Sequence, residues 1–243
     1  MENKMSPLAN AKNVETKDTD FLGGKLESNV YLCTVKMMYI DKNQNGAVFA
    51  NIEVAVKTDT GVRAYNETIY MSNKAGEFTF KDKKTGEDKP MPGYALVDTI
   101  CKLATGKSLT EQELAQKTIE VYDPQSKGKV QASKEVVVSM LKQKVQLAIV
   151  QQTENKSAKD ANGKYVPTAE TSVKNTIVKA FTADGLTQTE KDAGKSEGEF
   201  KEAWLKRNKG VVIDKTVKPA NGATAGGASK VAYKANAVDV DFD

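Results

Sequence analysis

Histidine is absent from this chain, and cysteine occurs only twice in its 243 residues. Zinc fingers and zinc knuckles need a set of Cys and His ligands, and triad hydrolases need a histidine base, so both classes are excluded. The phosphate-binding loops GxxxxGK[ST] and GxGxxG are also missing. We therefore expect no enzymatic activity, no metal and no other cofactor.

Long apolar runs are lacking too. No stretch approaches the roughly 20 apolar residues that a bilayer-spanning helix needs, and the polar N-terminus lacks the apolar segment of a signal peptide. Cys33 and Cys101 have apolar neighbours, which favours buried, reduced thiols over a disulfide. We expect a cytoplasmic protein without contact to a membrane.

Acidic residues are scarce in the body of the chain relative to lysine. The net charge is +4, but residues 235–243 contain three aspartates and no base, which leaves +7 on the residues before them. Charge is therefore segregated by sign along the chain. The pattern predicts a basic body with an acidic C-terminal end.

Three extended segments follow a polar N-terminal arm. Residues 30–40, 47–57 and 62–72 alternate apolar and polar side chains, as half-buried strands do, and tight turns separate them. The first turn ends in Asn45-Gly46, a pair that tolerates the backbone of a hairpin. These segments predict a three-stranded meander.

Alternation also assigns side chains to the two faces of this meander. One side of the first strand is expected to carry Tyr31, Cys33, Val35, Met37 and Tyr39. In the second strand Phe49 lies opposite the apolar face that contains Val48 and Ile52. Tyr65 and Tyr70 have opposite parity in the third strand, so at most one of them shares the surface of Phe49.

A second hairpin is expected at 141–181. Its first strand alternates around Val145 and Ile149, and its second covers 173–181. The connection at 153–170 has no apolar cluster and is expected to project as a mobile basic finger. The whole hairpin contains seven lysines and three acids, which makes it a candidate anion clamp.

Other elements complete the order of the body. We predict a lysine-rich hairpin at 78–89, a helix at 94–104 ended by Gly106, a short helix at 110–116 and a strand pair within 118–130.

The C-terminal part begins with two capping boxes. Thr187 with Glu190 and Ser196 with Glu199 have the spacing that marks helix starts, and they predict a helix that docks on the body. A Gly/Ala-rich linker follows. The expected division is a flexible arm at 1–27, a binding domain with its C-terminal helix at 28–210, and a linker with an acidic tail at 211–243.

Three meander strands, a helix and then a hairpin is the element order of the OB-fold. The predicted fold class is therefore mainly β with helices (α+β). We expect a five-stranded OB-fold-like barrel with an inserted helix, extra hairpins, a C-terminal helix and a disordered acidic tail.

Aromatic and basic residues interleave along the predicted strands and loops. Single-strand binders need this mixture, because bases stack on aromatic rings while cations follow the phosphates. The candidate single-stranded DNA contacts are Lys36, Tyr39, Phe49, Arg63, Tyr65, Tyr70, Lys81, Lys83, Lys84, Lys144, Lys156, Lys159, Lys164, Tyr165, Lys174 and Lys179. The candidate partner-binding residues of the tail are Asp239, Asp241, Phe242 and Asp243.

With its segments VYLCTVKMMYI, NIEVAVK, KVQLAIVQQTENK and NTIVKAF and its tail DVDFD, the chain resembles bacteriophage single-stranded DNA-binding proteins. The resemblance implies an OB-fold core that binds single-stranded DNA with little sequence preference during DNA replication and recombination in the infected host cell. It also implies a tail that recruits replication, recombination or transcription proteins and competes with DNA. In bacterial relatives the tail ends in Pro-Phe, whereas here Asp243 follows Phe242.

Two other functions remain open at this point. The chain can be an RNA-binding OB-fold protein, or a protein-interaction scaffold that binds no nucleic acid. The tail can be merely solubilising, and the chain can self-associate on DNA.

Overall fold

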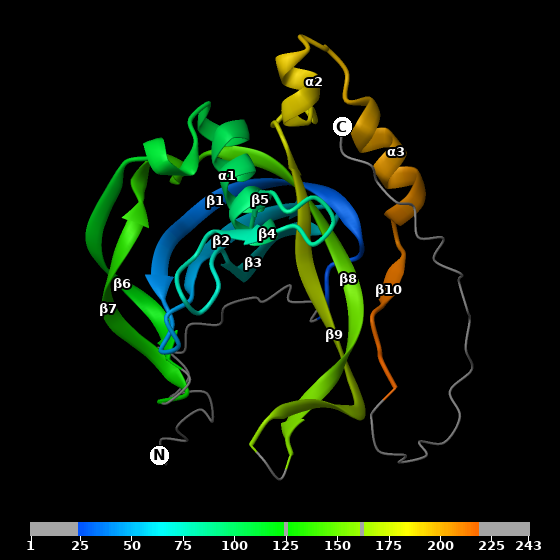
Figure 1. Ribbon diagram of the computed structural model, residues 1–243. Helices are drawn as coiled ribbons and strands as arrows, with labels where there is room; N and C mark the ends of the chain where they lie inside the picture. The colour runs from blue at the N-terminus through cyan, green and yellow to red at the C-terminus, as the bar shows by residue number, and fades with distance from the viewer. Residues whose placement is uncertain (1–23, 124–125, 161–162, 219–243) are drawn as a thin grey trace, which may run out of the picture.

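A long meander and two long hairpins make up most of the computed structural model, which describes residues 24–123, 126–160 and 163–218 (Figure 1). The fold is mainly β, as expected. The strands are β1 (Asn29–Lys42), β2 (Val48–Thr58), β3 (Gly61–Tyr70), β4 (Thr79–Lys81), β5 (Asp88–Pro90), β6 (Leu114–Asp123), β7 (Gly128–Val137), β8 (Lys144–Lys159), β9 (Tyr165–Phe181) and β10 (Val212–Asp214). The helices are α1 (Pro92–Thr105), α2 (Gln188–Asp192) and α3 (Glu199–Asn208), with 3-10 turns η2 (Leu109–Glu111) and η3 (Val138–Met140).

The main sheet has the order β10-β8-β1-β2-β3, with β9 beside β8, and β7 joining β1 to β6. All of these pairs are antiparallel except β10 with β8. Among the described residues no ladder joins β3 to β9, so the strands do not close into a barrel. The predicted closed barrel is therefore not observed.

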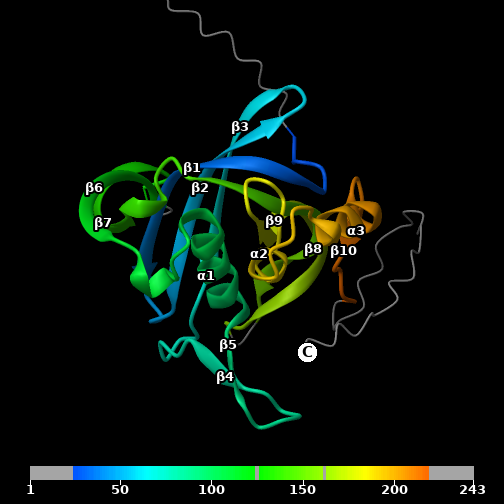
Figure 2. The ribbon, with the colours of Figure 1, turned by 90° about the horizontal axis from the view of Figure 1, so that it is seen from above.

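Strand β1 carries two partners on one edge. Its start pairs with β8 and its end pairs with β7, while β2 occupies the other edge. The two hairpins therefore leave β1 at different ends. Figure 1 shows them extending to the same side, away from α1, and Figure 2 shows them on opposite flanks of α1. We call residues 114–137 the β6–β7 arm and residues 151–175 the β8–β9 arm.

A β-bulge at Lys36 changes the faces of β1. The register with β2 shifts between Val35 and Met37, so Met38 joins the core at 1% exposure. Tyr39 then points to the opposite face from Cys33. The predicted grouping of Met37 and Tyr39 with Cys33 was wrong, because an extra residue in one strand reverses the alternation after it.

Helix α1 covers the inner face of the meander. Its buried residues Val97, Ile100, Cys101 and Leu103 belong to the same core as the inward side chains of β1, β2, β8 and β9. The helix starts at Pro92, and Gly106 ends it in a left-handed conformation, as predicted. Gly93 is required here, because a Cβ at this position would lie 1.9 Å from the Tyr70 carbonyl oxygen.

Side chains bridge the gap between β3 and β9. The Asn175 carboxamide accepts a hydrogen bond from the Leu26 N–H (2.8 Å) and donates to the Leu26 carbonyl oxygen (2.7 Å). The Glu67 carboxylate on β3 accepts from the Ile177 N–H of β9 at 2.7 Å. Leu26, which we expected in a flexible arm, is 5% exposed and part of the core.

Several local predictions are confirmed. The hairpins β4–β5 and β6–β7, the helix α1 and the capping box of Thr187 with Glu190 are present. Both cysteines are free and buried, and burial raises the pKa of each thiol to about 12.

Other local predictions were wrong. The expected finger at 153–170 is built from the outer halves of β8 and β9, because their ladder continues beyond the core to Lys159 and Tyr165. The expected helix at 110–116 is a single 3-10 turn, after which the chain pairs with β7. Gly198 caps α3 in place of Ser196, without a side-chain bond.

The C-terminal segment lies along β8. Phe200 of α3 contacts Phe181 with ring centroids 6.3 Å apart, and β10 pairs with β8 in parallel. The Val217 N–H donates to Asn155 Oδ1 at 2.7 Å. Residues 212–214, which we assigned to the linker, are therefore part of the sheet.

No helix in the described ranges is long and apolar enough to cross a membrane.

Candidate nucleic-acid interface

The outer face of the meander, opposite α1, brings three predicted aromatic residues together. Phe49 and Tyr70 are cross-strand partners on β2 and β3, with ring centroids 5.7 Å apart in an edge-to-face contact. Tyr39 on β1 pairs with Asn51, two residues from Phe49 on the same face. Tyr70 is 52% exposed. The register places these rings on the face opposite the core side chains that pack against α1.

A polar rung lies beside the rings. Asn51 Nδ2 donates to Thr68 Oγ1 at 3.0 Å, and Asn66 Nδ2 donates to Asn51 Oδ1 at 2.9 Å. Asn51 is 8% exposed, so the groups that can hydrogen-bond base edges are the exposed Asn66 amide and Thr68 hydroxyl, while the rings can stack on base faces. We did not predict Asn51 or Thr68, although both share the parity of Phe49 or Tyr70 in their strands.

Lys134 of β7 is a second residue that we missed. Its ammonium contacts Asp41 Oδ2, and Asp41 lies directly across the ladder from Phe49. The base of the β6–β7 arm therefore brings a cation to the edge of the aromatic surface. Burial, and next to it the negative charge of Asp41, raises the pKa of Tyr39, so its phenol stays neutral. No local sequence signal could reveal the Lys134 contact, since 93 residues separate it from Asp41.

Two predicted contacts lie on the inner face. The Arg63 guanidinium donates to the Gly24 carbonyl oxygen, and the Tyr65 hydroxyl donates to Glu67 Oε2 at 2.8 Å. Their positions in the β3 ladder and their hydrogen bonds both place these side chains beside the gap between β3 and β9. The structure thus separates Arg63 and Tyr65 from Phe49, contrary to their grouping in one predicted surface. The prediction that at most one of Tyr65 and Tyr70 shares the surface of Phe49 is confirmed, and that residue is Tyr70.

The β8–β9 arm presents both paired and unpaired lysines. Lys156 binds Glu170 at 3.0 Å, and Lys174 binds Glu154 at 2.7 Å, so their charge is compensated. Near the tip, the Lys159 ammonium lies 5.6 Å from the centroid of the Tyr165 ring. Lys164 is exposed in the same tip. The free positive charge of this arm is therefore concentrated at its end.

The remaining predicted lysines are dispersed. Lys36 is exposed at the β1 bulge, and Lys179 lies over the Phe200 ring on the α3 side of the sheet. Lys144 lines a hollow of about 510 Å³ between α1 and α2, together with Lys142 and Lys191. Among the described residues, no hydrogen bond, ion pair or ring contact joins these positions to Tyr39, Phe49 or Tyr70.

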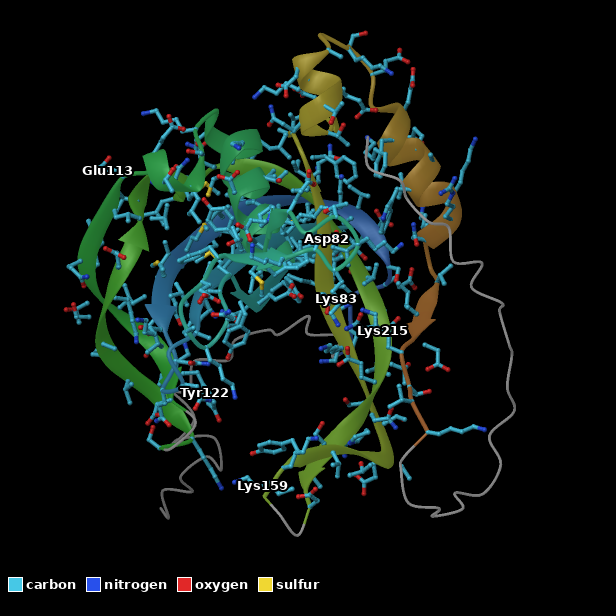
Figure 3. The ribbon with its side chains drawn as sticks, in the orientation of Figure 1. Asp82, Lys83, Glu113, Tyr122, Lys159 and Lys215 are labelled. Atoms are coloured by element: carbon cyan, nitrogen blue, oxygen red, sulfur yellow. The ribbon has the colours of Figure 1, made fainter. Side chains whose placement is uncertain are left out.

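Lys81, Lys83 and Lys84 lie on or beside the β4–β5 hairpin, where Lys89 binds Asp82 at 2.7 Å and Lys83 is labelled in Figure 3. Figure 2 shows this hairpin extending from the body between the two arms.

No protein-family model and no curated protein matches this chain. Among the residues that the structure describes, no group of three or more His, Cys, Asp or Glu side chains could hold a metal ion. The predicted tail residues Asp239, Asp241, Phe242 and Asp243 lie outside the described residues.

Proposed function

We propose that this chain binds single-stranded DNA with little sequence preference through the outer face of the meander. The observation that carries this proposal is the cluster of Tyr39, Phe49 and Tyr70 on the outer face beside a polar rung, in which Tyr70 is exposed and the other two rings are half-buried. Each base stacked on an aromatic ring contributes on the order of 1–3 kcal/mol, and stacking accepts any base.

The strand order supports the proposal. The sequence β3-β2-β1-β8-β9, with α1 between β3 and β8, is the order of an OB-fold opened between β3 and β9. OB-folds bind oligonucleotides across the face of their second and third strands, which here are β2 and β3. We propose that the chain is such an opened OB-fold.

The positive charge of the chain also supports the proposed DNA binding. The chain before residue 235 carries +7, and Lys159 and Lys164 lie near the tip of the β8–β9 arm, while Lys134 at the base of the other arm is paired with Asp41. Cations around an aromatic surface can follow the phosphates of a strand that stacks there.

We further propose that the acidic tail recruits replication, recombination or transcription proteins, as in the phage proteins that the sequence resembles. Val217, close to the last described residue, hydrogen-bonds Asn155 in the β8–β9 arm. The described part of the chain thus ends beside the β8–β9 arm.

Fluorescence anisotropy with labelled single-stranded DNA, duplex DNA and single-stranded RNA tests the function. We expect the tightest binding to single-stranded DNA and a log affinity that falls with log salt by roughly 0.7 per neutralised phosphate. Tighter binding to RNA identifies the RNA-binding alternative. If the protein binds none of the three nucleic acids, the proposal is overturned and the protein-interaction scaffold is the remaining function.

A pair of variants locates the surface. Tyr70→Ala should weaken single-strand binding by about 1–3 kcal/mol. The control is Phe200→Ala, which removes an aromatic ring of similar exposure (45%) from α3 and should leave affinity unchanged. Equal effects of both substitutions would place the interface elsewhere.

A further inference from the structure

The two most exposed large aromatic side chains of the described residues lie near the tips of the two arms. Tyr122, at the end of β6, is 65% exposed, and Tyr165, at the start of β9, is 66% exposed. Figure 3 labels Tyr122 near the lower end of the β6–β7 arm and Lys159, the neighbour of Tyr165, near that of the β8–β9 arm. Both tips lie on the side of the molecule away from α1.

Each tyrosine has lysine beside it. Lys127 is exposed in the turn that adjoins Tyr122, with a positive φ of 52°. Lys129, the cross-strand partner of Tyr122, is instead paired with Glu120 at 2.8 Å. In the other arm the Lys159 ammonium lies over the Tyr165 ring. The two tips thus carry the same combination of a stacking surface and cations, although they come from unrelated segments.

Packing does not explain the β6–β7 arm. No residue of β6 is buried, and the only buried residues of β7 are Val136 and Val137, at its base. Ten residues per strand extend about 33 Å, so the Tyr122 ring lies far from any core. An exposed aromatic residue at such a place is typical of an interaction site.

We propose that the tip of the β6–β7 arm is a second contact for the same DNA strand, with Tyr122 stacking on a base and Lys127 contacting a phosphate. This inference rests on the proposed function. The strand crosses the outer face of the meander and is held at both ends by the arm tips. The β6–β7 tip engages only strands that extend beyond the central face.

The test compares Tyr122→Ala with a matched control on oligonucleotides of two lengths, about 6 and about 24 nucleotides, which bracket the usual site sizes. Val62→Ala is the control, since Val62 is 73% exposed near the tip of the β2–β3 hairpin but offers no ring. Tyr122→Phe keeps the ring and reports on stacking alone.

We expect Tyr122→Ala to weaken binding of the long strand roughly 5- to 100-fold, the range that one stacked base gives. Binding of the short strand should change less than twofold. Tyr122→Phe and Val62→Ala should match the wild-type protein on both.

Two results would overturn the inference while leaving the proposed function intact. One is wild-type affinity of Tyr122→Ala for the long strand. The other is an equal loss on both lengths, which would make Tyr122 part of the central face. Failure of the wild-type protein to bind either strand would instead reject the proposed function itself.

Discussion

The two faces of the meander are made by the same strands and differ in almost every other respect. The inner face buries Ile52, Val54 and Val56 at 1% exposure or less against α1. The outer face of the same strand carries Phe49, which lies edge-on to the partly exposed ring of Tyr70. Strand alternation thus separates a surface that stabilises the fold from one that is free to bind a ligand.

The tyrosines of β3 illustrate the difference. Tyr65 points inward and donates its hydroxyl to Glu67, and burial raises the pKa of its phenol. Tyr70, five residues later, points outward and contacts Phe49. The residue type is the same, so its role follows from the face that it occupies. Substitutions on the inner face should affect stability, and those on the outer face should affect binding.

The largest effect is expected at the centre of the inner face. Ile52→Ala should lower the free energy of unfolding by about 2–5 kcal/mol, because it opens a cavity in a packed core. Urea denaturation measures this loss. The fraction that stays folded should bind single-stranded DNA with wild-type affinity. A normal unfolding curve with impaired binding would reverse our assignment of the faces.

A smaller loss is expected at Glu67, where β3 meets β9. Glu67→Ala leaves the Ile177 N–H and the Tyr65 hydroxyl without their acceptor and should cost about 1–3 kcal/mol of unfolding free energy. Glu67→Gln keeps an acceptor for Ile177 and should retain most of the stability. An Ala variant as stable as the Gln variant would show that this bridge does not close the gap.

The Glu67 bridge also predicts a pH dependence. Burial raises the pKa of the Glu67 carboxyl, outweighing the hydrogen bonds from Ile177 and Tyr65 that lower it. The folded state therefore favours the protonated form of Glu67. The resulting stabilisation is full below the pKa of the unfolded state, roughly 4.3, and is lost as pH rises through the higher pKa of the folded state. The stability of the wild-type protein relative to Glu67→Gln should thus fall as pH rises through that window. Parallel stability curves for the two proteins would contradict the raised pKa.

On the outer face, Phe49→Ala should weaken single-strand binding by about 1–3 kcal/mol. The unfolding free energy should fall by only about 1 kcal/mol, because the edge-to-face contact with Tyr70 is the main interaction lost. Anisotropy titration and urea denaturation of the same preparation separate the two quantities. A loss of stability greater than the loss of affinity would show that Phe49 is structural.

The smallest effect is expected for Thr68→Val, which removes a hydroxyl of the polar rung while keeping the shape of the side chain. Asn51 Nδ2 still has Asn66 Oδ1 within 3.3 Å, so stability should change by less than about 1 kcal/mol. Affinity for poly-dT and poly-dC should change equally if stacking dominates. A change in base preference would instead show that the rung reads base edges.

The local sequence pattern predicted the secondary structure correctly where the strand pairing is regular. Val48 to Val56 of β2, the helix α1 and the box of Thr187 with Glu190 depend on contacts within a few residues, and the sequence predicted them. The face of Tyr39 was missed because the bulge at Lys36 reflects how β1 fits both β2 and β8. Alternation carries no signal for such a shift.

The candidate site likewise combines features that the sequence predicts with features that only the tertiary structure shows. The sequence by itself determined that Phe49 faces away from the core and that only one of Tyr65 and Tyr70 can accompany it, since side chains alternate along any strand. Only the tertiary structure decided that Tyr70 is the one, that Lys134 reaches Asp41 beside it, and that Arg63 and Tyr65 are used to bridge β3 and β9. The physical reason is that the deciding contacts join distant residues, with 39 positions between Gly24 and Arg63, 93 between Asp41 and Lys134 and 110 between Glu67 and Ile177. Their partners are chosen by the pairing of strands rather than by any neighbouring residue.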